Sequence, residues 1–417
     1  MFDSIFIGMS GMEGFSKGLK VISNNVANLN TPGFKSSNLQ FTDAFYQQGS
    51  AAEFASGNRD QPTLFGSGLE TLSTIIDFKS GDTQQTSNPL DVSIGGDGFL
   101  VSQDKASGAR AYTRDGQLQF NSDDVLVSTT TGKQILGYAT ADAHDLQPIT
   151  LDGLKISLPK ATSKVVFAGN VSFPQPVTGA DGVVTTGPIP DVPVDVAVDD
   201  SAGTLHTLHL NLTARTDPHG NPTGTWTVTI TDGVKPVGIG SIGFVAGRVS
   251  PSQDTVTFTY PPGSGGTNVT LDFSTNVTSF SQGNTSSLGA TSQDGYAAGT
   301  ITKSTFDESG VLTLTYSNGQ TATGAQLALA QFRSLDSLQQ QGRGEFTSAD
   351  PAAIALIRPN TAGSAKIAAS QFEMSNVDLS GEFSNLIVMQ RGYQASSNIL
   401  STANDMLQEL FDMRGGR

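Results

Sequence analysis

The sequence predicts a multidomain chain in which long N- and C-terminal α-helices pair as a coiled coil, with two all-β domains between them, one inserted in the other. Three observations support this fold class. Apolar residues recur every seven positions at both ends of the chain, β-branched runs separated by Gly-rich turns fill the middle, and the composition changes sharply inside that middle. At 417 residues the chain is also too long for one compact core.

The first thirty residues predict an amphipathic helix of about seven turns. The apolar residues are spaced seven or three apart and fall on one face, as a helix-pairing seam requires. The predicted seam consists of Ile5, Met12, Phe15, Leu19, Ile22, Val26 and Leu29.

This helix is expected to end at about Asn30. Pro32 disfavours helical geometry at Thr31, and a Pro-Gly pair suits the two central positions of a type II turn, with Gly33 at positive φ. The sequence therefore predicts an abrupt change of chain direction at Asn30–Gly33.

The C-terminal segment repeats the heptad pattern. Its predicted seam consists of Leu379, Leu386, Met389, Tyr393, Leu400, Ala403, Leu407 and Leu410. Two heptad helices at opposite ends of one chain favour pairing with each other, although each could instead pack on its own domain.

Composition divides the rest of the chain. A Gln-, Ser- and Gly-rich stretch predicts an extended connector with a few short strands, and the segment that follows is rich in predicted strands. Between about residues 144 and 288 the chain holds 13 of its 18 Pro, eleven Asp and no Glu, which is typical of a turn-rich all-β domain. The predicted division is 1–30 with 361–417 (helical), 31–88 (connector), 89–143 with 289–360 (discontinuous β-domain) and 144–288 (inserted β-domain).

Charge and composition exclude several classes of function. The net charge of -15 offers no basic surface for nucleic acid and disfavours anionic membranes. The chain has no Cys, which rules out disulfides, thiolate metal sites and thiol nucleophiles. No apolar run approaches the roughly 18 residues of a membrane span, and Asp3 stands where a secretory signal would carry positive charge.

The sequence contains no catalytic constellation, so neither an enzyme nor a cofactor or metal site is expected. The GxGxxG match at Gly238–Gly243 continues into "FVAGRVSPSQ", where a helix should begin. His206 and His209 are three apart in a predicted strand, which places them on opposite faces. No GxSxG elbow accompanies the many serines.

Both ends of the chain resemble the flagellar rod, hook and hook-associated axial proteins. The residues that carry this resemblance are "SNNVANLNTPGFK" and "SNVDLSGEFSNLIVMQRGYQASSNILSTANDMLQEL". In the middle, "NPLDVSIGGDGFLVSQ" and "YTRDGQLQF" are similar to the β-domain of hook proteins. The chain departs from the family pattern at Gly392 and at Ala369-Ser370, both expected in the C-terminal helical region. The resemblance does not extend to the predicted inserted domain.

The resemblance implies a structural subunit that polymerises with copies of itself into the flagellar hook, a flexible curved tube that acts as a universal joint between rod and filament. It further implies export without a cleaved signal peptide by the flagellar type III apparatus, and contacts with hook cap, distal rod and hook–filament junction proteins outside the cell. The terminal helices would line the inner tube, and Asn30–Gly33 would turn the chain outward. The alternatives are a distal rod or hook-associated axial protein, or a monomeric extracellular β-rich binding module.

Overall fold

The computed structural model describes residues 2–44, 46–48, 64–66, 68–140, 142–180, 182, 184–218, 220–261, 266–348, 350–361 and 365–415. The chain forms two compact units. The first comprises Met1–Asp152, Lys303–Leu314 and Ala322–Arg417, and the second comprises Gly153–Thr302 and Thr315–Thr321. Residues 49–63 of the predicted connector lie outside the described part.

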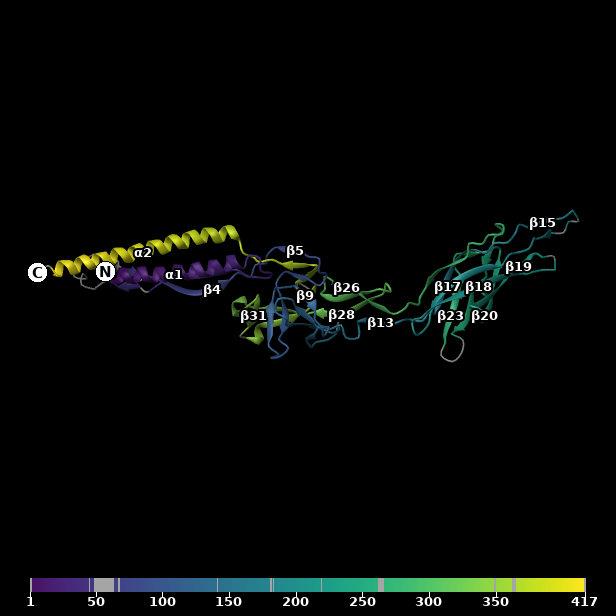
Figure 1. The fold of residues 1–417 in the computed structure, drawn as a ribbon, viewed down its shortest axis with the longest axis horizontal. Helices are drawn as coiled ribbons and strands as arrows, with labels where there is room; N and C mark the ends of the chain where they lie inside the picture. The colour runs from purple at the N-terminus through teal and green to yellow at the C-terminus, as the bar shows by residue number, and fades with distance from the viewer. Residues whose placement is uncertain are drawn as a thin grey trace, which may run out of the picture. The chain divides into compact units, whose positions relative to one another are not determined.

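Two long helices, α1 (Phe2–Ala27) and α2 (Leu379–Gly415), lie side by side and antiparallel in the first unit (Figure 1). The predicted pairing of the terminal helices is therefore confirmed. Helix α1 ends at Ala27, and residues 28–30 form turns instead of the expected last helical residues.

The C-terminal helix begins later than the sequence indicated. Residues 361–378, assigned above to the helical domain, contain the strands β33 (Lys366–Ala369) and β34 (Gln371–Glu373). The expectation that Ala369-Ser370 is helical is wrong, because Ala369 ends β33 and Ser370 has a φ of 57° between the two strands.

A two-stranded ribbon covers a second side of α1. It pairs β1 (Ser37–Asp43) antiparallel with β4 (Leu69–Ile76), and the short strands β2 (Tyr46–Gln48) and β3 (Leu64–Gly66) pair with each other. A Cβ on Gly14 would lie 2.7 Å from the Leu69 side chain, so glycine permits the close approach of ribbon and helix. Figure 1 shows β4 running along α1.

This ribbon corrects the expected course of the chain. After the turn at Asn30–Gly33 the chain runs back along α1 as β1, instead of continuing away from the helices. It leaves the helical part only after β4 returns. The reversal covers apolar surface of α1 that α2 does not reach, which is a physical reason for it.

The β part of the first unit is built on one branched sheet. Its main path runs β13-β26-β27-β28-β11-β7-β8-β31-β30, with β9, β10, β12, β29 and β32 paired beside it; β13 (Ile156–Ser157) and the residues of β26 that pair with it belong to the second unit. The strands before residue 150 are β5 (Thr83–Gln85), β6 (Val92–Gly95), β7 (Phe99–Gln103), β8 (Arg110–Thr113), β9 (Leu118–Phe120), β10 (Leu126–Ser128), β11 (Gln134–Tyr138) and β12 (Gln147–Pro148). Later strands are β26 (Gly299–Phe306), β27 (Val311–Tyr316), β28 (Thr321–Leu327), β29 (Leu329–Phe332), β30 (Leu338–Gly342), β31 (Glu345–Ser348) and β32 (Ile354–Ile357), with short 3-10 turns η1 (Leu335–Ser337) and η2 (Pro351–Ala353).

Strands from two distant stretches of sequence meet in this sheet. Strand β11 pairs with β28 and β7 with β29, and buried aromatic residues of both stretches form a shared core, in which the ring centroids of Phe99 on β7 and Phe346 on β31 are 5.8 Å apart. The boundary between the two compact units falls within β26, β27 and β28. The domain limits 89–143, 289–360 and 144–288 stay predictions.

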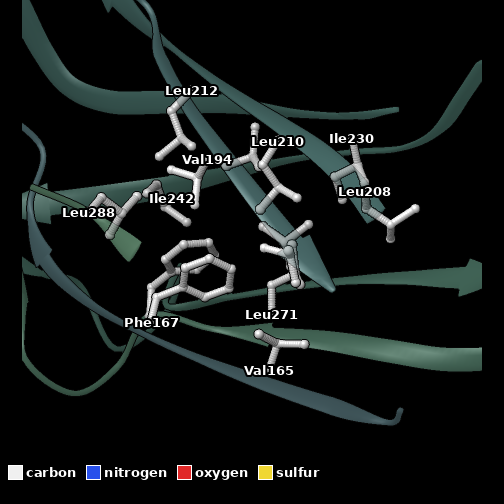
Figure 2. Close-up of a cluster of buried hydrophobic side chains, with 14 of the residues drawn as sticks. Val165, Phe167, Val194, Leu208, Leu210, Leu212, Ile230, Ile242, Leu271 and Leu288 are labelled. Carbon is white, nitrogen blue, oxygen red and sulfur yellow. The ribbon is translucent and has the colours of Figure 1, made fainter. Parts of the chain in front are cut away.

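All described elements of the second unit are strands. These are β13 (Ile156–Ser157), β14 (Lys164–Asn170), β15 (Val177–Thr178), β16 (Val184–Thr185), β17 (Val192–Asp199), β18 (Leu205–Thr216), β19 (Pro222–Asp232), β20 (Lys235–Val245), β21 (Arg248–Val249), β22 (Thr255–Tyr260), β23 (Thr267–Asp272), β24 (Val277–Thr278) and β25 (Gly289–Gln293). The sheet order is β17-β18-β19-β20-β21-β24-β14-β23-β22, with β25 on β14. Alternating inward residues build the core shown in Figure 2.

The GxGxxG match of the sequence lies inside strand β20. A Cβ on Gly240 would lie 2.4 Å from Val256, and one on Gly238 would lie 2.8 Å from Phe258. The glycines thus let β22 pack closely on β20, and the element directly after β20 is the short strand β21, not the helix that a phosphate site of this kind requires. His206 contacts Asp200 and His209 contacts Asp195, so the two imidazoles have separate partners.

Candidate functional site

The facing surfaces of α1 and α2 form the seam that the sequence predicted in part. On α1 every predicted residue is at least partly buried: Ile5, Met12, Phe15, Leu19, Ile22, Val26 and Leu29, the last in the turn beyond the helix. On α2 the partly or fully buried residues are Leu386, Met389, Leu400, Ala403 and Leu407.

Three predicted seam residues of α2 are instead exposed, each for an identifiable reason. Leu379 and Leu410 lie near opposite ends of α2, where α1 offers no helical residue opposite them. Tyr393 is displaced because the ring of Phe15 packs over its neighbour Gly392, where a Cβ would lie 2.6 Å from the ring. The seam therefore passes through Gly392.

Glycines line the closest contacts of the two helices. A Cβ on Gly8 would lie 3.2 Å from the backbone oxygen of Ser396, and one on Gly11 would lie 2.6 Å from Ser396 Oγ. Gly18 faces the side chain of Met389 in the same way, at 2.9 Å from its sulfur. Gly8 and Gly11 bring the helix backbones close together, and Gly18 makes room for the large side chain of Met389.

A buried polar cluster fixes the register of α1, α2 and β1. Asn25 is fully buried, and its Nδ2 donates to Glu382 Oε1 and to the Ser37 carbonyl oxygen, both at 2.8 Å. The Ser37 backbone N–H donates to Asn25 Oδ1 at 3.0 Å. A shift of any one element would leave buried polar groups without partners, so this cluster specifies one alignment.

The predicted turn has the geometry that Pro-Gly requires. Gly33 has a φ of 66°, and the Phe34 N–H donates to the Thr31 carbonyl oxygen across the turn. The positive φ predicted for Gly33 is confirmed. A Cβ here would also lie 2.6 Å from the backbone nitrogen of Asp115, so the turn packs directly against the β part.

A buried ion cluster joins the turn to the β part of the unit. The carboxylate of Glu373 on β34 accepts from Lys35 Nζ at 2.5 Å, from Arg114 Nη1 at 3.1 Å and from the Gly81 N–H at 2.9 Å. The side chains of Glu373, Lys35 and Arg114 are at most 3% exposed. Burial lowers the pKa of Lys35, while the adjacent Glu373 carboxylate opposes that shift.

Asn376 ties together the segments that meet beside this cluster. Its Oδ1 accepts from the Ser36 N–H at 2.7 Å, and its Nδ2 donates to the carbonyl oxygens of Asp77 and Lys79. Its own N–H donates to Phe34. The end of α1, the return from β4 and the entry to α2 are therefore joined at one point.

Sequence reasoning missed these polar clusters. Asn25 and Asn376 lie in the quoted family motifs, but an Asn side chain carries no sequence signal of the distant partners that it meets in the fold. Lys35, Arg114 and Glu373 are far apart in sequence and carry no local signal of pairing. A buried ion pair is visible only once the fold brings its members together.

The outer faces of the helix pair carry many large apolar side chains. They are between 38% and 79% exposed, and comprise Phe6, Ile7 and Met9 of α1 with Phe383, Ile387, Val388, Ile399, Met406, Phe411 and Met413 of α2. So much apolar surface on one element marks an interaction site. Among the described helices, none is both long and apolar enough to cross a membrane.

Comparisons with known proteins find similar chains along the whole sequence. Family models match at residues 5–35 ("Flagella basal body rod protein"), 93–173 ("Flagellar hook protein FlgE/F/G D1 domain") and 369–413 ("Flagellar basal body rod FlgEFG protein C-terminal"). The flagellar hook protein FlgE of Treponema pallidum is 30% identical, with 99% of this chain and 100% of that protein covered. FlgE of Salmonella typhimurium is 29% identical, with 97% and 98% covered. A crystal structure of Helicobacter pylori FlgE2 gives a TM-score of 0.44 at 15% identity, with 68% of this chain and 98% of that chain covered.

Proposed function

The chain belongs to the flagellar hook protein family and is a structural subunit of the flagellar hook; from this premise we propose that subunits polymerise through the outer faces of α1 and α2. The observation that carries the proposal is the band of exposed apolar side chains on this helix pair. The seam and the β1–β4 ribbon cover other sides of the two helices, so among the described residues this band is the surface left for neighbouring subunits to cover.

The predicted seam and turn residues have a supporting role in this proposal. The seam residues hold α1 and α2 together, and the turn at Asn30–Gly33 holds the pair against the β part of the same unit. Each copy would then present the same rigid apolar surface to its neighbours. Rigid, repeated surfaces are what a regular helical polymer requires.

The family also suggests where and with what the chain works. We propose that it is exported by the flagellar type III apparatus, assembles outside the cell beneath a hook cap, and contacts distal rod and hook–filament junction proteins at the two ends of the polymer. Its role is structural rather than catalytic. The full-length relatives are hook proteins, which favours this assignment over a rod or hook-associated protein.

The test is electron microscopy of the purified protein at high salt, where wild-type protein should form tubes. Val388→Ser, at an exposed position of α2, should raise the protein concentration needed for tubes several-fold and leave the urea unfolding midpoint unchanged. Val234→Ser, at a 96% exposed position of the second unit, is the matched control and should assemble normally. Equal effects of both substitutions, or no tubes from the wild type, would contradict the proposal.

A further inference from the structure

The C-terminal end of α2 has no partner on α1. Gly8 faces Leu400, and α1 begins six residues earlier, at Phe2. Six residues of helix rise about 9 Å, so beyond about Met406 no residue of α1 faces α2. In Figure 1 the yellow end of α2 extends past the start of α1. Residues 406–413 are called the α2 tip below.

The α2 tip combines apolar and acidic side chains. Met406, Leu410, Phe411 and Met413 are between 45% and 79% exposed. Asp405, just before the tip, and Glu409 and Asp412 within it are exposed and form no ion pair with any described residue. The tip continues the packed part of α2 and leaves these apolar side chains in water, so a surface that covers its apolar side and accepts negative charge would stabilise it.

A groove with matching chemistry lies at the other end of the helix pair. Its volume is about 480 Å³, within the range of pockets that enclose small ligands. Val21 of α1, Ile76 of β4 and Leu338 of β30 supply apolar surface, and neutral polar side chains such as Gln340 surround them. Lys20 is the sole charged residue lining the groove, and it has no ion-pair partner among the described residues.

We propose that the α2 tip of one subunit docks into this Lys20 groove of the next subunit; this inference rests on the proposed function and names the partner surfaces. The contact brings Glu409 and Asp412 toward Lys20 and places apolar side chains of the tip on apolar side chains of the groove, so charge and polarity match at these residues. Tip and groove lie at opposite ends of the helix pair and are different surfaces. Such a head-to-tail contact joins two different surfaces and adds subunits in one direction, and it gives an open helical polymer when its rotation does not close a ring.

A contact between two tips is the main rival. It would bring Glu409 and Asp412 of one copy against the same acidic residues of another, and like charges in contact are unfavourable. A two-fold contact of that kind would also end in a dimer and would not extend. Both arguments favour the groove.

Engineered cysteines test the contact directly, because the chain contains no cysteine of its own. Tubes of the double variant Gln340→Cys and Leu410→Cys should, on mild oxidation, give a ladder of covalent oligomers on a denaturing gel. Gln340→Cys with Ile399→Cys, in the middle of α2, is the matched control and should stay monomeric. Dimers from Leu410→Cys alone would show that tips pair, and tubes without any ladder would overturn the proposal.

Charge reversal provides an independent measurement at low ionic strength, where surface charges are screened least. Lys20→Glu or Glu409→Lys alone should raise the critical concentration for tubes roughly two- to tenfold. The double variant exchanges the two charges, so its critical concentration should return most of the way to the wild-type value. Lys235→Glu, an exposed lysine of the second unit, should have no effect. A critical concentration that stays raised in the double variant would contradict a direct contact.

The two proposals fail in different ways. Wild-type tubes without a cross-link would reject only the contact, whereas absence of wild-type tubes would reject the proposed function itself.

Discussion

At the scale of single residues, Glu373 has the largest expected effect on stability, because its carboxylate faces two buried cations. Glu373→Gln should lower the free energy of unfolding by about 3 to 5 kcal/mol, since Lys35 and Arg114 would stay buried without a negative partner. Urea unfolding followed by circular dichroism measures this. Glu308→Gln is the control, because Glu308 is 75% exposed and its partner Lys366 is 3.9 Å away. A loss below about 1 kcal/mol for Glu373→Gln would show that water reaches the cluster.

The effect of packing at Gly33 can be measured by comparison with another glycine that also has positive φ but has free space around it. Gly132 also has positive φ, at 71°, but no atom lies within 4 Å of its Cβ position. Gly132→Ala should cost about 1 to 2 kcal/mol from the left-handed conformation alone. Gly33→Ala should cost clearly more, because its Cβ would also meet the backbone of Arg114 and Asp115. The measurement is the urea unfolding midpoint, and similar losses in both variants would refute the packing argument.

Asp272 gives the second unit a specific acid sensitivity. Hydrogen bonds from Lys164 and Ser274 lower the pKa of Asp272 from 3.8 to about 2. A depressed folded-state pKa stabilises the protein above the unfolded value, and this contribution disappears as the pH falls from about 3.8 to about 2. We expect this contribution to the free energy of unfolding to be about 1 kcal/mol, because Lys164 is half exposed and solvent weakens its interaction with Asp272.

The measurement follows from the position of the sole tryptophan. Trp226 is 1% exposed in the core of the second unit, so its fluorescence reports unfolding of that unit. The difference in unfolding midpoint between wild type and Asp272→Asn should shrink as the pH falls from 4 toward 2. A difference that is constant over this range would mean that Asp272 is not titrating there.

At the scale of elements, the close approach of α1 and α2 depends on which glycine is replaced. Alanine in place of glycine favours a helix by about 1 kcal/mol, so a tolerated substitution should stabilise it. Gly18→Ala meets the flexible end of Met389 and should be neutral or stabilising. Gly392→Ala meets the ring of Phe15, which is itself held against Phe41, and should destabilise the pair. The temperature at which each variant loses its helical circular dichroism signal measures this difference. A higher temperature for both variants would show that the helices can move apart without a loss of stability.

The same elements show how far the sequence could predict the fold. Heptad spacing identified both helices and most of the seam, because periodic burial leaves a local pattern. Pro32-Gly33 identified the turn, because few residues tolerate its geometry. The return of the chain along α1 was not predicted, since the pairing of Ser37 with Ile76 depends on residues far apart in sequence. The displacement of Tyr393 likewise depends on a ring from the other helix.

At the scale of the whole molecule, the structure indicates where most of the second unit can be removed. Lys160 and Tyr296 form a two-way backbone bridge next to the pairing of Ile156 with Thr300, so the chain enters and leaves this unit at adjacent positions. We expect a chain in which a short Gly/Ser linker replaces residues 161–295 to fold its first unit and still form tubes, because the helix pair, groove and ion cluster all lie outside the deletion. Electron microscopy and urea unfolding by circular dichroism measure this. A well-folded deletion chain that never forms tubes would show that the second unit is required for assembly.

The polar clusters around Glu373 and Asn376 also have a mechanical consequence. A single peptide strand between two bodies acts as a swivel, because its backbone bonds rotate freely. Here residues 77–82 and 374–377 pass from the helices to the β part side by side, and Met374 donates to Asp82 while Asn376 bonds to Asp77 and Lys79. Twisting one part against the other would have to break these bonds and separate the buried charges. The junction therefore resists torsion, so a rotation applied to the helices is passed on to the β part of the same subunit.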